Sequence, residues 1–290
     1  MWSMLMVCFW VISPASAQAD QVFLARVQDG VVEVALPAEV SGWADLSWER
    51  QGEGMDPHWI SRMDAQSAQG VQVGDSMRLH RIKDGRSSGH CKVVSFVTRS
   101  WGLDDFGDRE SAIPTCGTAQ VYAQLDCGRD ASMYLAVPEG SRIAAYSPVS
   151  ERGRSLDSAA REALVTPQVK AEIIKASQGH YLGGEALKKE SRKVSLANHR
   201  GLHVIDVHWY SGKAEAECGG GDFTQRKWSL WDGQALVGPI RTWLPRPTAI
   251  FTVGSKQLVL RSAGFEGMVI EDLQGERVYQ SHDGFCGCAC

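Results

Sequence analysis

The chain has 290 residues, of which 43% are hydrophobic and 22% charged, and its formal net charge is −4. This length is enough for one large β domain or two domains of ordinary size, whose cores would not need disulfides to hold them together. The slightly acidic balance, with both signs mixed along the chain, argues against a nucleic-acid partner, which would favour a concentrated basic face.

The first seventeen residues have the pattern of a secretory signal peptide. An apolar segment spans residues 5–12, and Pro14 leads into Ala15-Ser16-Ala17, which places small residues where signal peptidase cleaves. The segment is too short to cross a bilayer as a helix. We expect residues 1–17 to be removed, leaving a periplasmic or secreted chain with no further membrane span. The alternative is a buried N-terminal element, because no Lys or Arg precedes the apolar segment.

Residues 18–150 are expected to form an N-terminal β domain. Two strand-like runs, 22–26 and 31–36, flank Gln28-Asp29-Gly30, where an Asp-Gly pair tolerates the positive φ of a tight hairpin. Further strands separated by turn residues are expected at 77–82, 92–98, 119–125, 132–137 and 142–146.

Residues 151–192 are expected to form a helical and charged connecting segment. Thr166 followed by Pro167 is a strong helix start, because the hydroxyl can cap free amides and proline loses no hydrogen bond there. Val169, Ile173 and Ile174 then share one face of the helix. A shorter helix is expected from 156 or 157 to 164, and the lysine-rich stretch after residue 179 is interpreted as a solvated connection.

Residues 193–290 are expected to form a C-terminal β-meander domain with a cysteine-rich tail. A nearly continuous strand over 202–210 is followed by three predicted hairpins, which turn at Asp232-Gly233, Gly254-Ser255 and Gln274-Gly275. The fold class is therefore mainly β, built from antiparallel hairpins as a sandwich, a barrel or a partial propeller-like meander. Two β regions are joined by a short helical segment.

The tail contains Cys286, Cys288 and Cys290 at alternate positions. On a regular strand the Cα atoms of neighbouring cysteines lie about 6.6 Å apart, which disfavours disulfides among them. Clustered thiolates suit Cu(I) or Zn(II), so the three form a candidate metal site. Structural disulfides are the favoured interpretation for an exported chain.

The disulfide candidates are Cys91, Cys116, Cys127, Cys218 and Cys286. Cys218 lies in a glycine-rich stretch and is the preferred partner for the tail, whereas Cys127 can pair with either Cys116 or Cys91. Because Cys8 lies in the signal peptide, seven cysteines remain after cleavage, and at least one must lack an intramolecular partner.

Other polar and aromatic groups are weaker site candidates. Asp206 and His208 share one face of the strand over 202–210, which is the minimum for acid–base chemistry, although a hydrogen-bonded pair is the favoured interpretation. A cluster of acidic residues is interpreted as a solvated turn rather than a calcium loop; it consists of Asp104, Asp105, Asp108 and Glu110. Three tryptophans are interpreted as core residues rather than as a ligand-stacking surface; they are Trp43, Trp48 and Trp59.

The sequence lacks the local motifs of the common exported enzymes, such as Gly-x-Ser-x-Gly, Ser-x-x-Lys and His-Glu-x-x-His. We therefore expect a non-catalytic structural or interaction module with a protein or cell-envelope partner and no cofactor. The alternatives are a metal-binding or thiol-redox protein that uses the tail, with copper or zinc bound there, and an exported hydrolase that uses Asp206 and His208.

Overall fold

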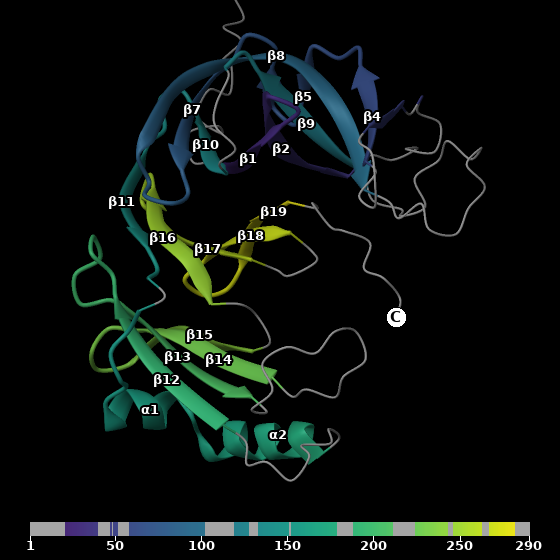
Figure 1. The fold of residues 1–290 in the computed structure, drawn as a ribbon. Helices are drawn as coiled ribbons and strands as arrows, with labels where there is room; N and C mark the ends of the chain where they lie inside the picture. Colours follow the sequence, from purple (N-terminus) through teal and green to yellow (C-terminus); the bar gives the residue numbers. More distant parts are fainter. Residues whose placement is uncertain are drawn as a thin grey trace, which may run out of the picture.

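The fold was analysed in a computed structural model of the chain. The residues that it describes are 21–39, 47, 49–51, 58–101, 119–127, 133–150, 152–178, 188–210, 224–242, 246–262 and 267–281. They form antiparallel β-sheets with two short helices, which confirms the predicted fold class (Figure 1). No helix in these ranges is long and apolar enough to span a membrane.

The first half of the chain supplies ten strands. They are β1 (Phe23–Gln28), β2 (Val31–Glu39), β3 (Glu49–Gln51), β4 (His58–Met63), β5 (Ser67–Ala68), β6 (Val71–Gln72), β7 (Ser76–Arg81), β8 (Ser87–Trp101), β9 (Ala119–Leu125) and β10 (Tyr134–Pro138).

Six of these strands close into a barrel. The order is β8-β7-β10-β1-β2-β9, and β9 returns to pair with β8. Strand β8 can hold this position because it is 15 residues long, so that it pairs with β7 near its start and with β4 and β9 farther along. Closure leaves none of these six strands with a free edge along its whole length, a common solution to the edge problem in all-β proteins.

The predicted hairpin at Asp29-Gly30 is confirmed, since β1 pairs with β2 across it and both residues have positive φ. The strands predicted at 119–125 and 132–137 are also present, but they are not sheet neighbours. Strand β9 lies between β2 and β8, whereas β10 lies between β1 and β7. Closure of the barrel therefore separates two strands that are close in sequence.

The remaining strands form two further sheets. A five-stranded sheet has the order β11 (Ile143–Pro148), β16 (Pro247–Val253), β17 (Lys256–Ser262), β18 (Met268–Asp272) and β19 (Arg277–Gln280). A four-stranded sheet has the order β12 (Lys188–Ser195), β13 (His203–Tyr210), β14 (Thr224–Trp231) and β15 (Leu236–Thr242). The three predicted C-terminal hairpins are confirmed as β14–β15, β16–β17 and β18–β19.

These elements stack in four layers, with the barrel, the five-stranded sheet, the four-stranded sheet and the helices in that order (Figure 1). The five-stranded sheet is the central sheet, and it is apolar on both faces. Side chains alternate along a strand, so neighbouring apolar residues pack on opposite faces. In β16, Phe251 packs into the barrel core, whereas Ile250 packs against the four-stranded sheet. Strand β17 does the same with Leu258 and Val259.

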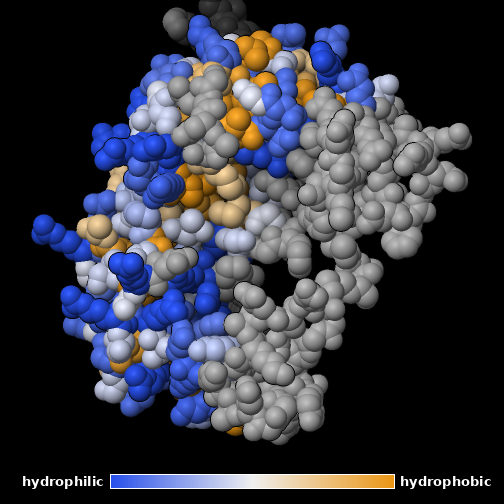
Figure 2. All heavy atoms as spheres, in the orientation of Figure 1, coloured by the Kyte–Doolittle hydropathy of each residue, from blue (hydrophilic) through white to orange (hydrophobic). Residues whose placement is uncertain are grey.

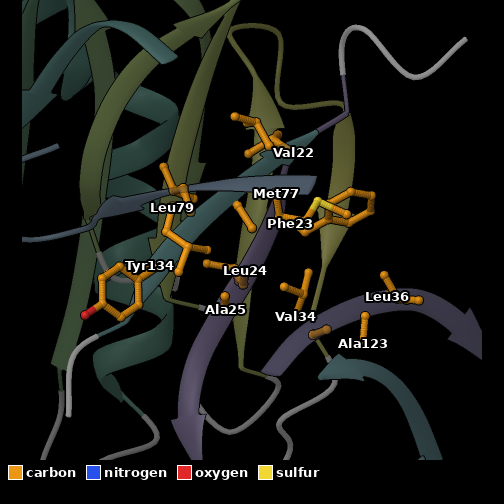
Figure 3. Close-up of a cluster of buried hydrophobic side chains, with 14 of the residues drawn as sticks. Val22, Phe23, Leu24, Ala25, Val34, Leu36, Met77, Leu79, Ala123 and Tyr134 are labelled. Atoms are coloured by element: carbon orange, nitrogen blue, oxygen red, sulfur yellow. The ribbon is translucent and has the colours of Figure 1, made fainter. Parts of the chain in front are cut away.

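The barrel core draws on residues from most of its strands. Figure 3 shows Phe23, Leu24, Val34, Met77 and Leu79 among the buried side chains of this core. Phe23 also meets Tyr279 of the five-stranded sheet edge to face, with ring centroids 6.2 Å apart. The barrel and the central sheet thus share one hydrophobic cluster.

Both predicted helices are present, as α1 (Ser158–Leu164) and α2 (Pro167–Gln178). Asp157 caps α1 by accepting a hydrogen bond from the Ala160 amide at 2.8 Å. Thr166 caps α2 by accepting one from the Val169 amide at 3.2 Å, as its position before proline predicts.

Two details of the middle segment differ from the prediction. Ile174 is 58% exposed, because α2 packs on the core through Val169 and Ile173, with Ala176 partly buried beside them. Residues 188–192 are not a solvated connection, since they begin strand β12, which pairs with β13 along its whole length. β12 is an edge strand, and charged side chains are typical of such strands because they discourage pairing with another chain.

Gly85 is required by the close approach of Tyr146. Its φ is +71°, and a Cβ placed there would lie 2.3 Å from Cγ of Tyr146, whose hydroxyl donates to the Ile82 carbonyl. We expect Gly85→Ala to lower the free energy of unfolding by about 2–3 kcal/mol, from steric overlap and backbone strain together.

Urea denaturation measures this loss, and Gly140→Ala is the matched control. Gly140 has a φ of +96° but nothing within 4 Å of its added Cβ, so that variant isolates the backbone cost. Equal losses in the two variants would contradict the steric argument.

Candidate functional site

The candidate pair Asp206 and His208 lies on β13, in the interior of the four-stranded sheet. Across the sheet, Asp206 is opposite Arg192 and Trp228, and His208 is opposite Glu190 and Arg226. This register brings two basic and two acidic side chains, with one imidazole, to neighbouring positions on three adjacent strands.

Asp206 is part of an arginine-rich environment. Its side chain is 2% exposed, and its Oδ2 lies 3.6 Å from Nε of Arg226. Burial raises the pKa of Asp206, and the positive charges of Arg226, Arg246 and Arg192 oppose that rise. Burial likewise lowers the pKa of Arg226. The carboxylate therefore acts as the counter-ion of a guanidinium.

His208 stacks on Tyr210, with ring centroids 5.0 Å apart. Burial lowers the pKa of His208, with the Arg226 charge acting in the same direction and Glu190 opposing it. Glu190 accepts hydrogen bonds from Arg192 at 2.7 Å and from the Tyr210 hydroxyl at 2.9 Å, which hold the pKa of this carboxyl below its usual range. Glu190, Arg192 and Tyr210 thus form a hydrogen-bonded group, and the His208 ring stacks on its tyrosine.

The structure also contains a serine–histidine pair that the sequence analysis missed. The Ser147 hydroxyl lies 3.1 Å from Nδ1 of His199 and accepts a hydrogen bond from the Asn198 amide at 2.9 Å. Its own proton is therefore available to the imidazole. The spacing suits a nucleophile and its base, but Ser147 is fully buried and cannot meet a substrate without a change in structure. No local signal could find the pair, since 52 residues separate its members.

His199 makes stability depend on pH. Burial lowers its pKa below the usual histidine value, and its Nε2 is buried without a partner in the described residues. The unfolded chain therefore binds more protons between the two pKa values, so stability falls as the pH decreases from about 7 through this interval. His80 contributes in the same direction because burial also lowers its pKa. The raised pKa of Asp206 acts oppositely, at lower pH.

We expect His199→Asn to flatten this part of the stability profile, because the amide keeps a polar atom near the position of Nδ1 but does not titrate. Urea denaturation at several pH values between about 5 and 8 measures the slope. His90→Gln, at an exposed position on β8, is the control. An unchanged slope in His199→Asn would assign the pH dependence to other groups.

Two buried ion-pair clusters lie elsewhere in the fold. Between the five- and four-stranded sheets, Glu271 accepts hydrogen bonds from Nε of Arg241 at 2.5 Å and from Nε of Arg261 at 2.9 Å, and all three side chains are at most 6% exposed. In the barrel, Arg99 donates from Nε and Nη2 to the two Glu33 oxygens, each at 2.7 Å. None of these residues was among the sequence-predicted site candidates, because partners 66 and 30 positions apart leave no local pattern.

A cavity of about 400 Å³ adjoins the barrel cluster. It is lined by Gln28, Asp29, Val31, Ile60, Arg62, Met63, Ser95, Phe96, Val97, Arg99 and Gln124. A second cavity has a volume of about 500 Å³, and its charged lining residues include the exposed Lys92 and Glu139. Of these two cavities, the one beside the barrel cluster is lined by a buried charged side chain, that of Arg99.

Of the two partners that the sequence analysis allowed for Cys127, the structure selects Cys91, with the two Cα atoms 5.6 Å apart. The other cysteine candidates, Cys116, Cys218, Cys286, Cys288 and Cys290, lie outside the described residues. So do Asp104, Asp105, Asp108, Glu110, Trp43, Trp48 and the Trp59 side chain. Within the part of the chain that is described, no group of three metal-ligating side chains is gathered. Copper or zinc binding by the tail stays a prediction.

Comparison of the chain with protein-family models, with curated proteins and with solved structures finds no match.

Proposed function

We propose that the mature chain is an exported, non-catalytic structural or interaction module, located in the periplasm or outside the cell, with a protein or cell-envelope partner. The observation that carries this proposal is that these reactive side chains form ion pairs and hydrogen bonds within the fold. Asp206 neutralises Arg226, Glu190 is bonded to Arg192 and Tyr210, and Ser147 is buried against His199. Each group stabilises a contact between strands or layers.

The described surface fits a soluble module that binds a partner. On the face shown in Figure 2, hydrophilic residues cover much of the lower layers, and hydrophobic residues show mainly near the barrel and the central sheet. The edge strand β12 is rich in lysine and arginine, which favours a solvated edge over self-association.

The test of the non-catalytic function is a panel of ester, glycoside, phosphate and peptide substrates, assayed with purified mature protein. We expect no turnover above buffer. Hydrolysis that is lost in both Asp206→Asn and His208→Gln, while Asp232→Asn in a solvent-exposed turn stays active, would overturn the proposal in favour of the exported hydrolase.

The proposed location has its own test. We expect protein recovered from the periplasm or the culture medium to begin near Gln18 when its N-terminus is sequenced. Recovery of the full-length chain only from the cytoplasm would contradict export.

Metal binding is a second candidate function because of the disulfide. Pairing Cys91 with Cys127 leaves five cysteines after residue 17, which are Cys116, Cys218, Cys286, Cys288 and Cys290. An odd number cannot pair completely within one chain, so at least one sulfur remains for a metal or another chain. Elemental analysis of protein purified under reducing conditions tests this function. Stoichiometric copper or zinc that disappears when residues 286–290 are deleted would support it, and metal-free protein would count against it.

A further inference from the structure

The cavity beside the barrel cluster has a preorganised polar wall. The Ser95 hydroxyl donates to Gln124 at 2.8 Å, and Gln124 donates in turn to Glu33 at 3.0 Å. Arg99 completes the chain through its two hydrogen bonds to Glu33 and a longer contact of 3.4 Å to Asp29. Because each side chain is held by the next, the wall keeps its shape without a ligand.

Arg99 and Arg62 retain unused hydrogen-bonding capacity, whereas the buried Glu33 does not. Glu33 accepts three hydrogen bonds, two from Arg99 and one from Gln124. In contrast, Nη1 of Arg99 is buried without a hydrogen-bond partner in the described residues. Arg62, which also lines the cavity, is exposed and has no ion pair with any described residue. A negatively charged group is therefore the best complement to the free donors.

Apolar side chains also line the cavity. Strand register places Ile60 opposite Arg99 and Arg62 opposite Val97 on neighbouring strands, so that aliphatic and guanidinium groups alternate along one wall. Val31 and Phe96 add further apolar surface. A volume of about 400 Å³ lies within the usual range of small-molecule sites.

From these features we infer that the cavity is a binding site for a small amphipathic carboxylate, with its carboxylate on Arg62 beside the Arg99 wall and its aliphatic part against Ile60, Val31 and Val97. This inference is independent of the proposed module function, since it assigns a small-molecule ligand rather than a macromolecular partner. No covalent step is involved.

Isothermal titration calorimetry with hexanoate, hexanol and hexylamine tests the inference on the full mature chain. We expect hexanoate to bind at millimolar or lower concentration, hexanol to bind more weakly and hexylamine not to bind. Arg62→Gln should weaken hexanoate binding about tenfold, because it removes a charge-assisted hydrogen bond. Arg86→Gln is the matched control, since its side chain is 80% exposed and does not line the cavity.

A second variant tests the apolar part of the cavity without changing any charge. Val31→Phe fills part of the cavity and should also weaken hexanoate binding, while circular dichroism confirms that the variant is folded. The inference fails if hexanoate does not bind the wild type, if hexylamine binds as well as hexanoate, or if Arg62→Gln binds hexanoate as tightly as Arg86→Gln does. Binding of a peptide with an apolar C-terminus, without binding of hexanoate, would overturn it in favour of a macromolecular ligand.

Discussion

Replacing Glu271 with glutamine is expected to lower the free energy of unfolding by about 3–5 kcal/mol, the usual cost of breaking a buried ion pair by removing one partner. Glu271 neutralises both Arg241 and Arg261 between two sheets, and all three side chains are at most 6% exposed. The variant keeps the shape of the side chain but leaves two guanidinium groups without their shared counter-ion.

Arg241 cannot easily turn away from this position. It lies over the Trp228 ring, with its Cζ 4.6 Å from the ring centroid, and it donates to the Asp272 and Leu273 carbonyls. These contacts hold the guanidinium in the interlayer space when Glu271 is neutral, so that the desolvation cost is not relieved by a movement into solvent.

Urea denaturation followed by tryptophan fluorescence measures the loss. Glu276→Gln is the matched control because Glu276 is exposed in the turn that follows the same strand. The triple variant Arg241→Met, Glu271→Leu and Arg261→Met should recover most of the loss, since it removes all three charges together. A single Glu271→Gln variant that is as stable as Glu276→Gln would show that the triad is not strongly desolvated.

The second large effect is expected from removal of the disulfide. The double variant Cys91→Ala, Cys127→Ala should lose about 4 kcal/mol of stability, because the unfolded chain regains the entropy that a cross-link between residues 36 positions apart removes. The bridge lies beside the β8–β9 pairing that closes the barrel, where Val93 is opposite Leu125. The Lys92 amide also donates to Asp126 at this point, at 2.7 Å. Opening the bridge therefore loosens the closure of the barrel.

Thermal and urea denaturation, each with and without reductant, measure this effect. Reductant should destabilise the wild type more than the double variant, which keeps the other five cysteines that follow residue 17. The double variant is its own control for other effects of the reductant. A wild type that resists reductant while the variant is strongly destabilised would assign the loss to side-chain packing of Cys91, which is 2% exposed, rather than to the covalent bond.

The local elements were predictable because local chemistry specifies them. Thr166-Pro167 predicted the start of α2, and the Asp-Gly and Gly-Ser pairs predicted hairpins that the structure confirms. The errors came where neighbours in space decide. Ile174 fits a helical apolar stripe, but it is 58% exposed, and Val169 and Ile173 are the residues of the stripe that are buried. The charged residues 188–192 were expected in a connection, but they form a strand that pairs with β13.

The candidate sites show the same division. Asp206 and His208 were found because a strand places alternate residues on one face, yet the sequence did not reveal that Asp206 would meet Arg226. The Ser147–His199 pair and the cavity lined by Arg62 and Arg99 were missed, since each joins segments that are distant along the chain.

The mainly β class, the turns and the two helix starts could be predicted, because each depends on residues a few positions apart. The closure of the barrel, the burial of the central sheet on both faces and the partners of the buried charges depend on contacts between distant segments. Glu33 and Arg99 are 66 residues apart, and Arg241 and Glu271 are 30 apart. Such pairs are chosen by the stacking of layers, whose contacts and desolvation costs no short-range pattern encodes.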